Sequence, residues 1–230
     1  MPRYWIATGI LGLGLLAAPY AQAQTYTNIG SDINTPLTFG TGLNVWTVTI
    51  TGCSTTGGGV GSCANDEVVG IVTTGVNASL SLTYQTTTNP GTNALVSANA
   101  AQTDDMTLSE VVDAPGNSSV SRSSLGMTGL LGGNPSTDAP VSETGSVALN
   151  TCIGCGNGVS PYTVSQTLTK ALQALTITKD INTSNFGSGT VEIQTVQQTF
   201  NVPEPASLSL LALGFGGLIG LRRRRARTLA

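Results

Sequence analysis

The sequence predicts an all-β fold: an antiparallel β-sandwich, jelly-roll-like or Ig-like, with one or two short helices and a C-terminal transmembrane helix. Three observations lead to this fold class. The middle of the chain holds short segments in which apolar and polar residues alternate. Gly- and Asn-rich turn signals separate these segments, and apolar stretches at both ends flank them. Ser and Thr are abundant in the middle, but its Val, Ile and Leu content and its low charge favour a folded domain over disorder.

Five segments of the body have the pattern of strands. In the first, Trp46, Val48 and Ile50 share one face and threonines occupy the other. In the last, the alternation breaks near Thr195 and Val196, which indicates a β-bulge. The five segments are 44–51, 68–73, 78–86, 175–181 and 191–202. Short strands joined by Gly/Asn turns are typical of sandwiches.

Two other segments favour helices, and one favours a loop. The segment 165–175 places apolar side chains at the i, i+3, i+4 and i+7 positions of a helix: Leu168, Ala171, Leu172 and Leu175. A second short helix is predicted at 107–112. The segment 117–143 contains few apolar residues, so we expect a long loop there.

The first residues, 1–23, have the pattern of a signal peptide. Arg3 provides a positive start, and 6–16 is an apolar run shorter than the ~20 residues of a membrane span. Ala21 and Ala23 then occupy the two small-residue positions that a signal peptidase pocket admits. We therefore predict cleavage after Ala23 by signal peptidase. The alternative is an uncleaved membrane anchor.

The last residues, 202–230, form a tail with three parts. As a helix, its apolar run at 206–221 spans about 24 Å, less than the ~30 Å hydrocarbon core of a bilayer. The arginines after it are costly to insert and stay on the cytoplasmic side. The tail therefore holds the body in the periplasm by a temporary inner-membrane anchor. The other parts are a rigid motif, Val202, Pro203, Glu204 and Pro205, and a basic stop at 222–227 that contains Arg222, Arg223, Arg224 and Arg225.

This tail resembles the PEP-CTERM sorting signal of Gram-negative bacteria. The resemblance covers 202–225, where a Pro-Glu-Pro motif, an apolar run and a basic stop follow one another, and an N-terminal signal accompanies them. It implies that an exosortase, a membrane cysteine peptidase, cleaves near the motif and passes the protein to the cell surface or the extracellular space. Proteins with this tail are commonly associated with exopolysaccharide and biofilm. The alternative is a plain C-terminal transmembrane anchor, and the body resembles no family.

The body between these ends, 24–201, is expected to be a single exported domain rich in Ser, Thr and Gly. It carries eleven acidic side chains against three basic ones, so its net charge is about −8. The basic residues are Arg122, Lys170 and Lys179. Such a surface does not neutralise phosphates, which argues against nucleic acid as a partner.

Four cysteines in an exported chain favour two disulfides. We pair nearest neighbours: Cys53 with Cys63, across a Gly-rich loop, and Cys152 with Cys155. The Cys-x-x-Cys unit has two other interpretations, a metal site and a thiol–disulfide exchange site. Neither is favoured, because the chain has no histidine and no βαβ pattern surrounds the unit.

The absence of histidine also excludes Ser-His-Asp and Cys-His catalysis. The chain has no phosphate loop and no EF-hand loop, and we expect no cofactor and no metal. Two carboxylates could cleave a glycoside, but Asp104 with Asp105, and Asp66 with Glu67, are neighbours in sequence and would point to opposite faces of a strand. We expect both pairs in solvated loops.

We expect a non-catalytic protein of the cell surface or extracellular matrix, whose Ser/Thr-rich strands present hydroxyls to exopolysaccharide. The alternative is a carbohydrate-binding module or adhesin with a defined glycan site. Trp46 and the few tyrosines would then be the candidate stacking residues, although a place in the core is the stronger interpretation of Trp46. An extracellular hydrolase is the third and weakest hypothesis.

Overall fold

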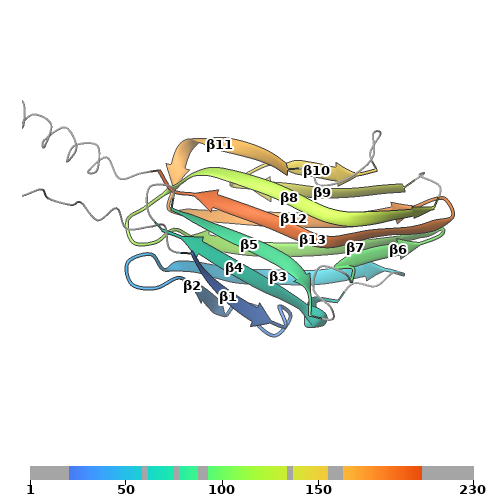
Figure 1. Ribbon diagram of the computed structural model, residues 1–230, viewed down its shortest axis with the longest axis horizontal. Helices are drawn as coiled ribbons and strands as arrows, with labels where there is room; N and C mark the ends of the chain where they lie inside the picture. Colours follow the sequence, from blue (N-terminus) through green and yellow to red (C-terminus); the bar gives the residue numbers. More distant parts are fainter. Residues whose placement is uncertain are drawn as a thin grey trace, which may run out of the picture.

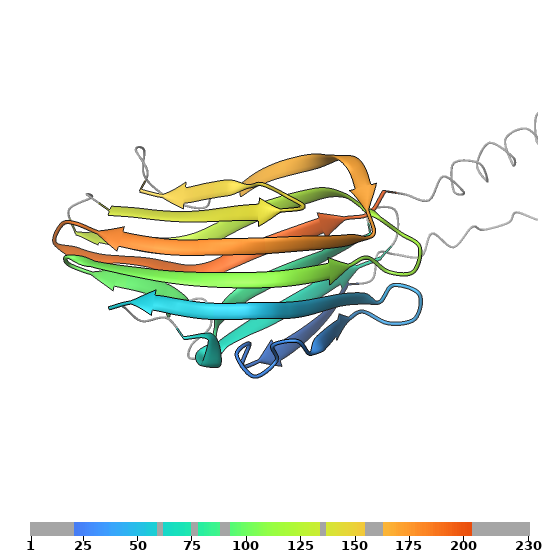
Figure 2. The same cartoon turned by 180° about the vertical axis from the view of Figure 1, so that it is seen from behind.

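The computed structural model describes residues 21–58, 62–74, 78–87, 93–133, 137–154 and 163–203. These residues form two antiparallel sheets that pack face to face as an elongated sandwich. Sheet A faces the viewer in Figure 1, and sheet B faces the viewer in Figure 2. The predicted all-β sandwich is confirmed.

Sheet A contains both ends of the described chain. Its strand order is β1 (Ala21–Thr27), β4 (Asp66–Thr73), β5 (Ser79–Thr86), β13 (Gly189–Asn201), β8 (Val120–Gly133) and β11 (Thr163–Leu172), and β6 (Val96–Asn99) also pairs with β13. The last strand of the body, β13, therefore lies in the middle of the sheet, between β5 and β8.

Sheet B supplies the other layer. Its strand order is β10 (Asn150–Ile153), β9 (Thr137–Gly145), β12 (Ala174–Asn185), β7 (Gln102–Asp113), β3 (Trp46–Gly57) and β2 (Pro36–Phe39). β7 and β12 form its centre and are paired over their full lengths.

The core fills the space between the two sheets, as the alternation of the strands requires. In β5, for example, Leu80, Leu82 and Tyr84 are buried and the residues between them are partly exposed. Trp46 of sheet B and Phe200 of sheet A are both fully buried, and their ring centroids lie 6.5 Å apart. Apolar burial of this kind is the main stabilising contribution in a sandwich.

The predicted bulge in the last strand is confirmed. The register between β13 and β8 shifts between Ile193 and Thr195. Thr195 and Val196, although adjacent, are both buried, which is the consequence of one extra residue in a two-residue alternation.

Both helix predictions are wrong. The segment 107–112 lies inside β7, where Met106, Leu108, Glu110 and Val112 point inward at every second position. The segment 165–175 forms the end of β11 and the start of β12. Its two threonines, Thr167 and Thr169, favour a strand, and a short apolar run fits both the helical and the strand period. In the described residues the one helical element is a single 3₁₀ turn, Cys63–Asn65.

The predicted long loop at 117–143 is also wrong, because most of it forms β8 and β9. β8 lies between β13 and β11 in sheet A. At Gly129 the absence of a side chain allows β13 to approach β8 closely. A Cβ on Gly129 would lie 2.0 Å from the carbonyl oxygen of Glu192. A strand of small residues therefore has a weak apolar signal.

No helix within the described ranges is long and apolar enough to cross a membrane. The predicted transmembrane segment 206–221 lies outside those ranges, as do the signal-peptide residues 1–20.

Candidate functional site

The sorting motif follows directly from the core of the sandwich. The backbone N–H of Val202 donates a hydrogen bond to the carbonyl of Ala78 at 3.0 Å, and its side chain packs against the core. Pro203 is exposed. Glu204, Pro205 and the basic stop 222–225 lie outside the described residues. The body therefore ends at Val202, and the first proline of the motif is already accessible.

The predicted signal-cleavage site lies at the same end of sheet A as the sorting motif. Ala21 pairs with Thr73, Thr73 with Ser79, and Ser79 with Asn201, in one row across four strands. Three interstrand spacings place Ala21 and Asn201 roughly 14 Å apart. β1 thus begins and β13 ends at the same end of the sandwich, at the left of Figure 1.

Cleavage after Ala23 would shorten β1 but keep its side-chain contacts. The three residues Ala21 to Ala23 begin the strand on the edge of sheet A. The new terminus, Gln24, uses its side-chain oxygen to accept a hydrogen bond from the N–H of Gly40 at 2.6 Å. Tyr26 donates to the carbonyl of Thr38 at 2.6 Å. Both contacts hold the remaining part of β1 against β2 and the residue that follows it.

The Cys53–Cys63 disulfide is confirmed. It joins β3 of sheet B to the 3₁₀ turn that precedes β4 of sheet A, with the two Cα atoms 6.1 Å apart. Cys152, in β10, is also disulfide-bonded. Its predicted partner, Cys155, lies outside the described residues.

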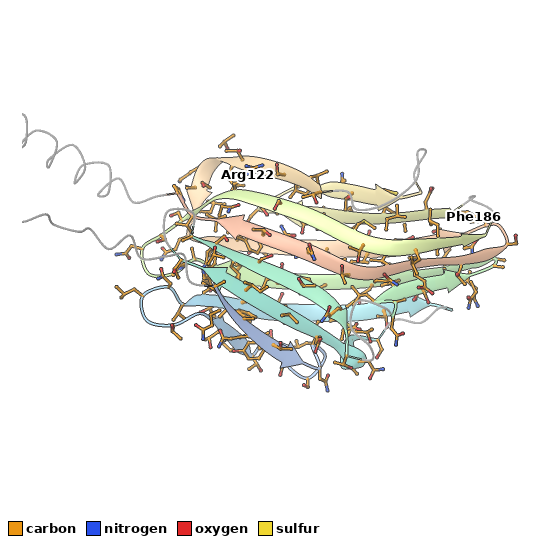
Figure 3. The ribbon with its side chains drawn as sticks, viewed as in Figure 1. Arg122 and Phe186 are labelled. Atoms are coloured by element: carbon orange, nitrogen blue, oxygen red, sulfur yellow. A yellow bond between two sulfur atoms is a disulfide. The ribbon has the colours of Figure 1, made fainter. Side chains whose placement is uncertain are left out.

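The aromatic residues do not provide a stacking platform on the described surface. Trp46 and Tyr84 are fully buried, so Trp46 cannot stack on a sugar as the carbohydrate-module hypothesis required. Tyr26 is half-buried with its ring edge-on to Phe39, at 5.1 Å between centroids. Phe186 is 75% exposed, but it lies at the tip of the β12–β13 hairpin, at the end of the sandwich opposite Arg122 in Figure 3.

The adjacent carboxylates are in strands, and the prediction of solvated loops is wrong. Asp66 and Asp104 are buried, in β4 and β7 respectively. Burial raises the pKa of Asp66 to about 7, and burial is also the main cause of the raised pKa of Asp104. Glu67 accepts a hydrogen bond from Gln85 at 2.7 Å. These side chains are spread over both sheets and do not converge on one site.

Hydroxyl and amide side chains cover the outer surface of sheet A. They form cross-strand pairs: Ser81 with Thr199 at 3.1 Å, Thr73 with Ser79 at 2.7 Å, and Thr128 with Thr195 at 2.6 Å. We call the central part of this surface the polar face of sheet A. It is defined by the outward side chains of Ser79, Ser81, Thr83, Gln197, Thr199 and Ser124.

Arg122 lies beside this polar face, at the end where the chain leaves the body (Figure 3). Its guanidinium donates to the hydroxyl of Ser165 in β11 at 2.8 Å. The outer surface of sheet B is also rich in hydroxyls, but it carries acids. Burial, followed by a hydrogen bond and charge repulsion from Asp180, raises the pKa of Asp105 to about 6. The polar face of sheet A contains no acid, although Glu67 and Glu192 lie elsewhere on the outer surface of that sheet.

A buried polar cluster between the sheets was not among the predicted site residues. Glu110, Glu143 and Lys179 point inward from sheet B, and Tyr84 and Gln198 point inward from sheet A. The signal was present in the alternation of the strands. Lys179 occupies an inward position between Ile177 and Ile181. A charged residue at such a position is rare unless it is paired.

No group of three or more His, Cys, Asp or Glu side chains in the described part of the chain could hold a metal ion. On the outer surface of sheet B, Asp105 and Asp180 form a pair of carboxyl groups joined by a hydrogen bond. This spacing is shorter than the ~5 Å or more that separates the two carboxyls of a glycosidase.

Comparison with solved structures gave two distant similarities. The family 11 carbohydrate-binding module of Clostridium thermocellum, solved with a β-1,3-1,4-mixed-linked tetrasaccharide, is 9% identical with a TM-score of 0.23, over 79% of this chain and 95% of that one. The enzymatically active domain of tailspike protein 4 from bacteriophage CBA120 is 13% identical with a TM-score of 0.22, over 66% of this chain. The match spans 19% of the tailspike's length. At these scores neither similarity carries an argument about function.

No curated protein matches the sequence, and no family model matches the body. The tail gives a specific result. PEP-CTERM proteins are exported and sorted to the cell surface, and the motif implies processing by an exosortase. Residues 201–225, which begin at the last residue of β13, match the family model of the PEP-CTERM protein-sorting motif, so this is an exosortase-sorted β-sandwich protein.

Proposed function

We propose that the protein is a non-catalytic component of the cell surface or extracellular matrix, and that the polar face of sheet A contacts exopolysaccharide. The observation that supports this most is the dense set of hydroxyl and amide groups on strands β5, β13 and β8, held in fixed rows by cross-strand hydrogen bonds. Polysaccharides present hydroxyls at regular intervals, and such rows can exchange hydrogen bonds with them without a deep pocket.

The charges favour sheet A over sheet B for this contact. The polar face of sheet A carries no acid and borders Arg122, whereas Asp105 and Asp180 lie on the outer surface of sheet B. An anionic polysaccharide would be repelled by sheet B and tolerated by sheet A. The non-catalytic role is supported by the position of Glu110 and Glu143, which are buried in the core and cannot reach a polymer in solution.

Cosedimentation of the purified body with exopolysaccharide from the producing strain tests the proposal. The double variant S81A/T199V removes a hydroxyl pair from the polar face of sheet A. We expect it to weaken binding by roughly tenfold, since each lost hydrogen bond contributes about 1 kcal/mol.

The matched control removes the equivalent pair from sheet B. Ser109 and Thr178 form a hydroxyl pair at 3.1 Å on its outer surface, so S109A/T178V makes the same chemical change on the other side of the sandwich. Binding should remain at the wild-type level. Equal loss in both double variants, or no binding by the wild type, would contradict the proposal.

The alternative proposal is a carbohydrate-binding module or adhesin with one defined glycan site. It predicts saturable binding to a single purified glycan, with one site per chain. The matrix role instead predicts many weak contacts along a polymer. A titration with short and long fragments of the same polysaccharide separates the two, because the affinity for a defined site stops increasing once the site is filled.

A further inference from the structure

The buried polar cluster brings one amine and two carboxyls together inside a core closed to solvent. Lys179 of β12 forms ion pairs with Glu110 of β7 and with Glu143 of β9, and the distance to Glu143 is 3.5 Å. All three side chains are essentially inaccessible to water. In the register of sheet B, Lys179 lies directly opposite Glu143 and diagonally across from Glu110.

This arrangement is costly as a set of charges. Removing an ammonium and a carboxylate from water costs several kcal/mol per ion, which their attraction often fails to recover. The second carboxyl would add an unbalanced negative charge. Burial raises the pKa of Glu143, and the charge of Glu110 raises it further while Lys179 opposes the shift. Glu143 is therefore protonated more readily than a carboxyl in water, and it lies next to the pair.

Further hydrogen bonds fix the positions of the two carboxyl groups in the cluster. The hydroxyl of Tyr84 donates to Oε2 of Glu110, and Nζ of Lys179 contacts Oε1 of the same carboxyl. Gln198 donates to Oε2 of Glu143 at 3.3 Å and to the hydroxyl of Ser123 at 2.6 Å. This leaves Oε1 of Glu143, which has no hydrogen bond, facing the amine.

We propose that Lys179 and Glu110 join spontaneously in the folded protein to form an intramolecular amide between β12 and β7, with Glu143 and Tyr84 as the catalytic residues. The bond would cross-link positions that are 69 residues apart in the sequence. It would replace two buried charges with one neutral amide. The inference does not depend on the exopolysaccharide role.

The reaction balances without any further reagent. The ammonium of Lys179 passes one proton to Oε1 of Glu110, and the resulting amine attacks Cδ. A C–N bond forms while the carbonyl electron pair moves to Oε2, where the Tyr84 hydroxyl stabilises it. Glu143 gives its proton to the departing Oε1 and takes one from Nζ, so it is regenerated. The C–Oε1 bond breaks, and one water leaves.

Mass spectrometry of the wild-type protein tests the proposal directly. After reduction and denaturation, the intact mass should be lower by one water than the mass calculated from the sequence between the observed ends. Peptide mapping should yield a branched fragment that joins the Glu110 and Lys179 peptides. Cyclisation of an N-terminal Gln24 removes ammonia and is separated by exact mass. A wild-type protein of full mass, with both peptides recovered unlinked, would overturn the proposal.

Variants assign the roles. K179M removes the amine and should restore the full mass, whereas K170M, at an exposed lysine, should keep the loss of one water. E143Q keeps a polar side chain but cannot relay the proton, so amide formation should slow by ~100-fold or more. If E143Q cross-links as fast as the wild type, the assigned role of Glu143 is wrong. The peptide map of the wild-type protein shows whether the Glu110–Lys179 amide is present, even if K179M does not fold.

Discussion

Gly70 shows how a single residue sets the distance between neighbouring parts of the core. A Cβ at this position would lie 2.1 Å from the ring of Phe39, which packs over β4 from the other sheet. We expect G70A to destabilise the protein by about 1–3 kcal/mol, because the ring must shift in a close-packed core. Urea unfolding measures the change.

Gly52 supplies the control for that prediction. Its added Cβ would have Ser109 as the nearest neighbour, at 3.9 Å. G52A should therefore change stability much less than G70A. If the two variants lose the same stability, the close approach of Phe39 to Gly70 is not what makes glycine necessary there.

Asp66 predicts how stability depends on pH. Burial raises the pKa of this carboxyl from 3.8 to about 7, so the folded state binds a proton that the unfolded state releases. The sign follows from linkage: stability is greatest below pH 4 for this group and falls as pH rises from about 4 to about 7, by up to about 1.4 kcal/mol per pH unit. Thermal unfolding from pH 4.5 to 7.5 measures it.

The variant D66N removes this group and should flatten that part of the profile, with a gain in stability at pH 7.5. D138N, at an exposed site, controls for the loss of one negative charge. A D66N profile as steep as that of the wild type would mean that Asp66 is ionised in the folded protein at neutral pH.

At the scale of elements, the Cys53–Cys63 disulfide fastens β3 of one sheet to the turn before β4 of the other. In the chain-entropy account, a bridge over a separation of 10 residues stabilises by about 2–3 kcal/mol. We expect C53S/C63S to lower the free energy of unfolding by that amount. Reductant should then destabilise the variant less than the wild type, and an equal response would contradict the role of this bridge.

The strands that the sequence predicted contain a run of large apolar residues at every second position. Such runs are Trp46, Val48 and Ile50 in β3, Leu80, Leu82 and Tyr84 in β5, and Leu175 with Ile177 in β12, and their period indicates a strand. β8 was missed because Ser123 and Gly129 take inward positions where a large residue was expected. β7 was assigned in part to a helix because Glu110 interrupts its apolar series.

Local sequence patterns also could not predict the buried polar cluster. The local pattern placed Lys179 in a strand but Glu110 in a helix. Their meeting is decided by the pairing of β7 with β12, and pairing between distant strands leaves no local signal. Trp46 was correctly expected to favour the core. The cysteine pair Cys53–Cys63 was predictable because the two residues are close in sequence.

At the scale of the whole molecule, both processing segments meet one end of the sandwich. β1 begins and β13 ends in the same row of sheet A, and Phe186 lies at the far end. A body held at one end presents its long faces to the medium. This placement suits a protein that is anchored only until its tail is cut, because the sorting motif follows the end of β13 and lies outside the sheet.

The ends of the protein recovered from the cell surface test the central claim, export followed by removal of the sorting tail. Terminal peptide mapping by mass spectrometry should find an N-terminus at Gln24 and a C-terminus close to Pro203–Pro205, without Arg222–Arg225. A surface protein that retains the arginine cluster would contradict exosortase processing. A protein found in the cytoplasm with both ends uncut would contradict export itself.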